Sequence, residues 1–214
     1  MTDWHAWHRD YDDPGSDLSR RRRSVQTQVE SWLDARHEPV LRVISACSGD
    51  GRDLLEVLAR RPRDAVRVSA RLVELDAGLV DEARRTAAGH GLERVDVRRG
   101  DAGRTGSYVG AVPADLAMWC GVFGNLPDAD VRRTIATTKE LAAPAATVLW
   151  TRGRPTSGHG DEPVQLVRSW FAAEGFEEVH LDAPYDATYR VGVHRLVAEP
   201  VPLGADRAFF AFQR

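Results

Sequence analysis

The chain has 214 residues, of which 43% are apolar and 29% are charged, and its formal net charge is −3. These values are ordinary for one soluble globular domain with a substantial core. The slightly negative charge argues against a protein that holds nucleic acid through a broad basic surface. The two cysteines, Cys47 and Cys120, are too few for a disulfide framework and fit no structural zinc site, so we expect buried free thiols.

Membrane and export signals are not recognised in the sequence. No apolar run approaches the roughly 20 residues that cross a bilayer. The stretch Met1–His5 lacks a basic segment followed by an apolar one. We therefore expect no signal peptide, no membrane partner and a cytoplasmic location, and we leave a homodimer open.

The first 40 residues differ from the rest and predict a helical extension or lid (1–40) before a main domain (41–214). Aromatic and histidine side chains alternate from Trp4 to Tyr11, and apolar residues recur at helical spacing across Ser19–Arg36. The run Arg20–Arg23 resembles a nucleic-acid patch, but a solvated helix face is the interpretation we favour.

Beyond residue 40, strand-like and helix-like segments alternate. The strand candidates are Leu41–Ala46, Val66–Val73, Val95–Arg99, Ala114–Trp119 and Thr147–Thr151, with helical patterns at about Asp53–Arg60, Gly78–His90 and Asp130–Leu141. Such alternation predicts right-handed crossovers and a parallel sheet covered on both faces. We therefore expect a doubly wound, Rossmann-like α/β fold.

The last third changes this rhythm. A helix at Pro163–Glu174 is followed by strand candidates near Glu177–Leu181, Tyr189–Val197 and Arg207–Phe212. The turn-rich link Glu199–Gly204 suggests that the two final strands form an antiparallel hairpin. We expect a mostly parallel, seven-stranded sheet that ends in an antiparallel C-terminal hairpin.

The strand at Leu41–Ala46 runs into a Gly-x-Gly turn, Gly49-Asp50-Gly51, and a helical pattern follows at once. A nucleotide-bearing cofactor needs this geometry, because glycine lets the backbone approach the ligand and the helix N-terminus offers free N–H groups. Strand–glycine–helix turns also occur where nothing binds. The turn therefore gains meaning only from acidic residues at the neighbouring strand ends.

Glu74 ends the second strand, 23 positions beyond Gly51, where its carboxylate can accept hydrogen bonds from both hydroxyls of a ribose. Leu75 would then offer an apolar face to adenine, and Asp76 is better placed to cap the next helix. Asp101 follows the third strand and can accept a hydrogen bond from the amino group of adenine. Together these residues predict an adenosine-shaped site.

The ordered segments resemble the class I S-adenosylmethionine-dependent methyltransferases of the bacterial small-molecule type. The matching pieces are Val43–Gly51, Val73–Asp76, Gly100–Ala102 and Asp115–Met118, and Trp7–Pro14 is similar to lids of such enzymes. The resemblance implies S-adenosyl-L-methionine as cofactor. It assigns cofactor binding to Ser45, Ala46, Cys47, Gly49, Gly51, Asp53, Glu74, Leu75, Asp101, Ala102, Trp119 and Cys120.

Two positions depart from the family's pattern. Ser45 stands where the family usually has an acidic residue, which removes an anchor for the methionine end of the cofactor. Cys47 stands where the family has its first glycine, which implies a less tight turn or a displaced cofactor. Asp50 or Asp53 is a candidate to compensate, although Asp53 also suits the first turn of a helix.

Two other functions are less well supported. A dinucleotide oxidoreductase needs Gly-x-Gly-x-x-Gly, and Leu54 occupies the third glycine position. The segment Trp119–Pro127 lacks the Asn-Pro-Pro-Tyr or Asp-Pro-Pro-Tyr signature of methylases that act on nucleic-acid bases. We therefore expect a small-molecule substrate and no nucleic-acid partner. A non-catalytic, cofactor-binding regulatory module on the same fold remains the main alternative.

Residues for the methyl acceptor are less clearly marked, because in-line transfer needs alignment and, for some acceptors, a general base. His159 is the candidate base, since histidine titrates near neutral pH, but exposed loop histidines are common. Tyr11, Asn125 and Arg152 are candidates for substrate binding, with packing or surface ion pairing as the alternatives for Tyr11 and Arg152.

No metal site is predicted. His5 and His8 are three residues apart and can meet on one helical face, yet no third ligand is identified. A lid or surface role is the interpretation we favour for both.

Overall fold

The computed structural model describes residues 13–153 and 161–212, which contain one seven-stranded sheet with the order β3-β2-β1-β4-β5-β7-β6. The strands are β1 (Leu41–Ala46), β2 (Val68–Glu74), β3 (Val95–Arg99), β4 (Ala114–Trp119), β5 (Ala142–Gly153), β6 (Phe176–Asp182) and β7 (Tyr189–Leu196). The α-helices are α2 (Asp17–Asp34), α3 (Arg52–Arg60), α4 (Pro62–Ala65), α5 (Ala77–Gly89), α6 (Asp128–Leu141) and α7 (Glu162–Ala173). Short 3-10 helices lie at η2 (Thr105–Tyr108) and η3 (Phe123–Asn125).

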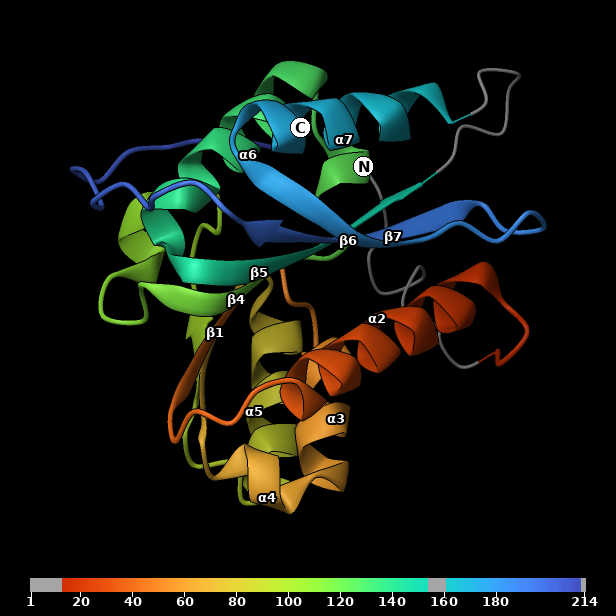
Figure 1. Cartoon of the computed structure of the whole chain (residues 1–214). Coiled ribbons are helices and arrows are strands. Elements are labelled where there is room, and N and C mark those ends of the chain that lie inside the picture. Colours follow the sequence, from red (N-terminus) through yellow and green to blue (C-terminus); the bar gives the residue numbers. More distant parts are fainter. Residues whose placement is uncertain (1–12, 154–160, 213–214) are drawn as a thin grey trace.

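Helices cover both faces of the sheet (Figure 1), as the alternating pattern predicts. One buried cluster joins α2, α3 and α5 to the sheet, and the other joins α6 and α7 to its opposite face. Strands β1 to β5 are parallel, and β7 runs antiparallel between β5 and β6. The predicted mostly parallel, doubly wound sheet with an antiparallel C-terminal hairpin is therefore confirmed.

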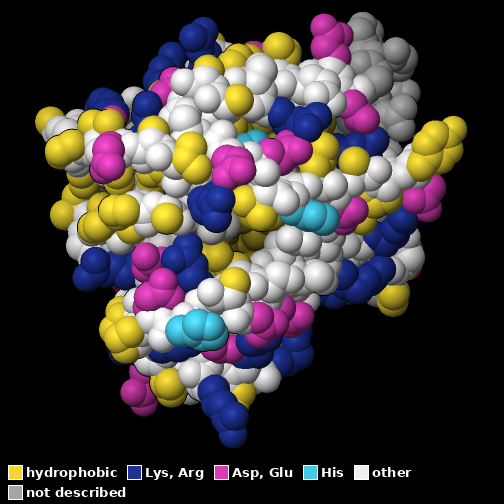
Figure 2. Space-filling model, in the orientation of Figure 1, with side chains coloured by type: hydrophobic (Ala, Val, Ile, Leu, Met, Phe, Trp, Pro, Cys, Tyr) yellow, Lys and Arg dark blue, Asp and Glu magenta, His cyan; other side chains and the backbone are white. Residues whose placement is uncertain are grey.

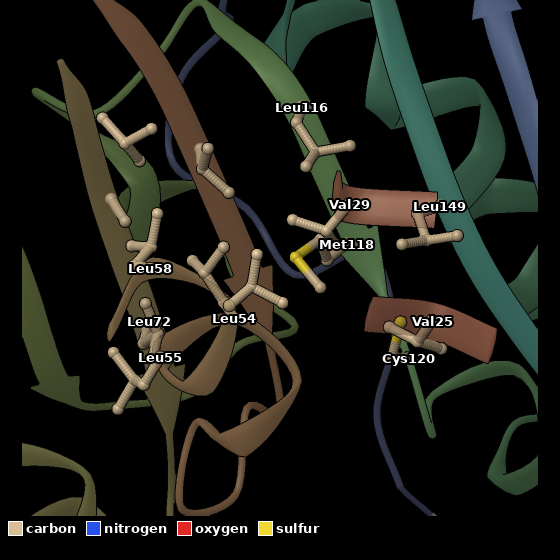
Figure 3. Packing of buried hydrophobic residues seen from close by; sticks show 14 of the residues in the cluster. Val25, Val29, Leu54, Leu55, Leu58, Leu72, Leu116, Met118, Cys120 and Leu149 are labelled. Atoms are coloured by element: carbon tan, nitrogen blue, oxygen red, sulfur yellow. The ribbon is translucent and has the colours of Figure 1, made fainter. Parts of the chain in front are cut away.

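Helix α2 packs into the core through its predicted apolar face. Val25, Val29 and Leu33 are at most 1% exposed and pack in the same cluster as Met118 of β4 (Figure 3). The side chain of Ser16 caps the helix by accepting a hydrogen bond from the backbone N–H of Ser19 at 3.0 Å. Burial of this face fixes α2 beside the carboxyl end of β4.

The arginines of α2 are tied to the rest of the protein. Arg20 pairs with Asp186 at 2.8 Å, and Arg22 pairs with Glu56 at 3.3 Å. Over the face in Figure 2, basic and acidic side chains are interspersed.

Among the described residues, no helix is long and apolar enough to cross a bilayer.

The hairpin is built from different segments than the sequence predicts. Strands β6 and β7 form it, whereas Arg207–Phe212 makes only one isolated bridge, from Ala208 to Arg104. Both edges of β7 are already occupied, by β5 and β6, so no edge is left for a third strand. The segment instead buries Phe209, which donates its backbone N–H to the carbonyl of Gly103 at 2.8 Å.

Candidate cofactor site

Three parallel strands end side by side at the carboxyl edge of the sheet. Ala46 of β1 lies in register with Val73 of β2, and Ser45 lies in register with Met118 of β4. The residues after these strands therefore share one edge, where ligands of open α/β sheets bind. This arrangement brings together the predicted site residues from β1, β2 and β4.

The turn after β1 is left-handed at three positions. The backbone φ angles are 49° at Cys47, 56° at Gly49 and 77° at Gly51. A Cβ at Gly51 would lie 2.7 Å from Leu55 Cδ1 and 2.8 Å from Leu72 Cδ2, so a side chain there would displace these leucines as well as strain the left-handed backbone. Cys47 also has a left-handed backbone, although it carries a side chain. Glycine would adopt this conformation without steric cost.

Glu74 holds this turn through its carboxylate. Oε2 accepts a hydrogen bond from the backbone N–H of Gly49 at 2.8 Å. Oε1 accepts from the N–H groups of Leu75 and Asp76, at 2.8 and 3.0 Å. The acidic group is therefore fixed at the junction of the β1 turn and the end of β2. Asp76 caps α5 as predicted, accepting from the N–H of Leu79 at 3.0 Å.

The residues beyond Glu74 combine an uncovered apolar side chain with a second carboxylate. Leu75 is 66% exposed although it is a large aliphatic residue. Asp101 is exposed after β3, and its Oδ1 accepts a hydrogen bond from the N–H of Gly103 at 2.8 Å. Ala102 is buried beside it, and its carbonyl accepts from the Tyr108 hydroxyl at 2.8 Å.

The Cys47 thiol lies near both of these carboxylates. Burial raises the pKa of the Cys47 thiol well above its usual value, and the charges of Glu74 and Asp101 raise it further. The thiol is therefore neutral at physiological pH. Two acidic groups around one half-buried side chain make this part of the site electronegative, which favours a cationic ligand.

Asp53, in the first turn of α3, is half-buried and brings a further carboxylate to the site. Burial raises its pKa; Asp50 adds to this effect, and the charges of Arg21, Arg22 and Arg52 oppose it. Its Oδ1 is buried and receives no hydrogen bond from the described residues. A buried carboxylate oxygen without a donor is costly, so this atom marks a place where a ligand can donate.

The end of β4 lies close to Asp53. Cys120 is 7% exposed, and burial raises the pKa of its thiol, with a further increase from the Asp53 charge. Ser45, near the end of β1, is 6% exposed. Trp119, in contrast, packs in the core, edge-on to Tyr108 at 6.3 Å between ring centroids, and its side chain is fully buried.

The candidate acceptor residues are only partly within the described chain. Asn125 is exposed on η3, and its Nδ2 donates to the carbonyl of Gly121 at 2.8 Å. Arg152, at the end of β5, pairs with Asp128 at 3.0 Å, and its Nη1 is buried with no partner among the described residues. The predicted base His159 and the predicted ligand Tyr11 lie outside those residues, as do His5 and His8.

Two residues of the site were not recognised from the sequence. The Ser48 hydroxyl is buried inside the turn with no hydrogen-bond partner in the described chain. Its position between the two conspicuous residues Cys47 and Gly49 is the signal that would have identified it. The charge of Arg21, on α2, acts on Asp53, whereas the sequence presented Arg21 only as part of a basic run.

Within residues 13–153 and 161–212, no group of three His, Cys, Asp or Glu residues is placed to hold a metal ion.

Comparisons with known proteins give structural likeness without close sequence similarity. No protein-family model and no curated protein sequence matches the chain. The structure is similar to magnesium protoporphyrin IX methyltransferase (ChlM) from Synechocystis PCC 6803 with bound SAM, with a TM-score of 0.66 and 16% identity over 92% of each chain.

Two further similar structures differ in their chemistry. The N,N-8-amino-8-demethyl-D-riboflavin dimethyltransferase (RosA) from Streptomyces davawensis has a TM-score of 0.52 and 22% identity over 74% of this chain and 50% of its own. The [4+2]-cyclase SpnF has a TM-score of 0.57 and 16% identity over 83% and 82%. At such identities the likeness shows the fold, and this chain has the fold of the class I S-adenosylmethionine-dependent methyltransferases.

Proposed function

We propose that this protein binds S-adenosylmethionine and transfers its methyl group to a small molecule. The observation that carries the proposal is the Glu74 carboxylate, held against the left-handed turn at Gly49 and followed by the exposed Leu75. A carboxylate, an open apolar side chain and a close backbone are the three features that an adenosine group requires.

The residues present fit this cofactor. Glu74 would hold the ribose, Leu75 would cover adenine, and Asp101 would accept from the adenine amino group. Two buried oxygens near the β1 turn, Ser48 Oγ and Asp53 Oδ1, have no hydrogen-bond partner in the described chain, as expected where a polar ligand binds. Backbone groups at the turn and the ends of β1 and β4 would line the remainder of the site.

When bound, the cofactor supplies an electrophilic methyl group on a sulfonium. The chain's own contribution is to fix the cofactor and align an acceptor, because positioning accounts for much of the rate in such displacements. The fixed Glu74 and the Gly51 turn are suited to this role, since both are held by contacts that do not depend on the ligand.

The acceptor is proposed to be a small molecule with an oxygen, nitrogen or carbon nucleophile. Asn125 and Arg152 border the ends of β4 and β5, and Tyr11 and His159 are kept as a proposed contact and a proposed base. Residues 1–40 are proposed to act as a lid, of which α2 supplies the anchored part. The similar structures ChlM and RosA are named for porphyrin and riboflavin-type substrates, which favours a small acceptor over a polymer.

Likeness to the [4+2]-cyclase SpnF makes a second function worth testing, because one fold can host different reactions. The alternative function for this protein is a cofactor-binding module that does not transfer a methyl group. The discriminating experiment incubates the protein with S-adenosylmethionine and panels of phenols, amines and activated methylene compounds, and measures S-adenosylhomocysteine. Acceptor-dependent product supports the methyltransferase. Tight cofactor binding without product across all panels supports the module.

A further inference from the structure

Asp53 has a buried carboxylate oxygen, Oδ1, that the described residues leave without a hydrogen-bond donor. Asp50, in the same turn, is instead fully engaged: Arg52 donates to it through Nε at 2.6 Å and through its backbone N–H at 3.2 Å. The two neighbouring carboxylates therefore differ, one neutralised within the protein and one left for a donor from outside.

The charges that act on Asp53 come from α2, from the turn after β1 and from the first residue of α3. Arg21 and Arg22 belong to α2, Asp50 lies in the turn, and Arg52 begins α3. Arg22 pairs with Glu56, and Arg52 pairs with Asp50. The arginine charges oppose the rise in the pKa of Asp53 that burial causes, while Oδ1 receives no hydrogen bond from the described residues.

Asp53 and Glu74 lie on opposite sides of the β1 turn. Glu74 ends β2, on one side of β1, whereas Asp53 lies near Cys120, which follows β4 on the other side. In Figure 3, Cys120 lies among the residues of α2 and β4, away from Leu72 of β2. A ligand whose ribose is held by Glu74 and which crosses the turn would thus place its other end at Asp53.

We infer that Asp53 binds the α-ammonium group of the cofactor's amino-acid end, with the buried Ser48 hydroxyl as a second acceptor. An ammonium carries three donors and a positive charge, which matches a buried carboxylate oxygen and a hydroxyl that both lack partners among the described residues. This inference rests on the proposed function, since it assigns one group of the same cofactor. Asp53 of α3 would then anchor the methionine end of the cofactor, because Ser45 of β1 has no carboxylate with which to do so.

The test measures binding by calorimetry with three ligands: S-adenosylhomocysteine, its analogue with hydrogen in place of the α-amino group, and 5′-methylthioadenosine. Asp53→Asn keeps the size of the side chain and removes its charge. We expect it to weaken binding of S-adenosylhomocysteine by about 10- to 100-fold, the effect of losing a hydrogen bond between charged groups. Binding of the deaminated analogue and of methylthioadenosine should be unchanged.

Glu56→Gln is the matched control, because it removes a carboxylate from the same helix, and Glu56 already pairs with Arg22 and Gln26. It should leave binding of all three ligands unchanged. An Asp53→Asn loss that is equal for the amino and deaminated ligands overturns the inference, as does no loss at all. Failure of the unaltered protein to bind S-adenosylhomocysteine is a separate result, which removes the proposed function itself.

Discussion

The carboxylate of Glu74 and the backbone N–H of Gly49 form a 2.8 Å hydrogen bond that links the end of β2 to the turn after β1. The same carboxylate accepts from Leu75 and Asp76, so its position is set before any ligand arrives. A preorganised acceptor binds more tightly than one that must be ordered on binding. This one contact therefore connects the fold to the proposed adenosine site.

Glu74→Ala should weaken S-adenosylhomocysteine binding by roughly 1–3 kcal/mol, the range for hydrogen bonds to a charged group. Methylthioadenosine should lose the same amount, because Glu74 is assigned to the ribose that both ligands contain. Calorimetry with each ligand measures both values. Glu93→Ala, which removes an exposed carboxylate from the turn before β3, serves as control. Unchanged affinity in the Glu74 variant would remove this residue from the ribose role.

Leu75→Ser should weaken cofactor binding by about 1 kcal/mol, or roughly fivefold, through loss of apolar area against adenine. Leu75 is 66% exposed without ligand, so the substitution should leave the unfolding free energy nearly unchanged. Val66→Ser is the matched control, since Val66 is 70% exposed before the other end of β2. Equal affinity of the two variants would contradict an adenine contact at Leu75.

Gly51→Ala and Gly121→Ala should differ in stability although both glycines have a φ of 77°. At Gly121 an added Cβ meets no atom within 4 Å. The substitution should therefore lower the free energy of unfolding only through the left-handed conformation, by about 1–2 kcal/mol. At Gly51 the new Cβ also meets Leu55 and Leu72 at under 3 Å, which adds about 1–3 kcal/mol of overpacking. Urea unfolding of both variants gives the difference, and equal losses would refute the steric role of Gly51.

Acid should destabilise the protein through His194. Burial lowers the pKa of His194 from 6.5 to about 4, Glu178 opposes the shift, and Nδ1 accepts a hydrogen bond from Trp150 Nε1 at 3.1 Å. As the pH falls, the imidazole of His194 takes up a proton at a higher pH in the unfolded chain than in the folded protein. The stability from keeping this imidazole neutral is therefore complete above pH 6.5 and is lost towards pH 4. The loss amounts to roughly 3 kcal/mol.

Urea unfolding between pH 7 and pH 4 checks this expectation against His194→Gln, which keeps an acceptor for Trp150 but cannot titrate. The variant should lose less stability over this range than the unaltered protein. His37→Gln, at an exposed histidine, should behave like the unaltered protein. The same pH slope in His194→Gln as in the unaltered protein would show that another group causes the acid loss.

Local pattern was sufficient for the elements that build the site. The observed bounds of β1 and β4 equal the predicted ones, because each strand is an apolar run limited by turn residues. The cap at Asp76 and the core face of α2 were likewise predictable from neighbouring residues. These features carry the prediction of the fold and of the adenosine end of the site.

Features that depend on distant partners were not predictable in this way. Arg207–Phe212 does not join the sheet as a strand next to β7, because β6 occupies that edge of β7. No local sequence pattern indicates this pairing. The resemblance assigns Trp119 to cofactor binding, and the packing of its side chain against Tyr108 and Phe209 depends on partners far away in the sequence. The lack of a hydrogen-bond partner for Asp53 Oδ1 among the described residues depends on how α2 packs over α3, where Arg22 of α2 pairs with Glu56.

The central claim is that the edge formed by Glu74 and the Gly49 turn binds S-adenosylmethionine. Titration of the folded protein with S-adenosylhomocysteine in a calorimeter tests it most directly. We predict saturable binding of one ligand per chain, weakened by Glu74→Ala and unaffected by Glu93→Ala. No heat of binding at millimolar ligand, from protein shown to be folded by circular dichroism, would contradict the claim.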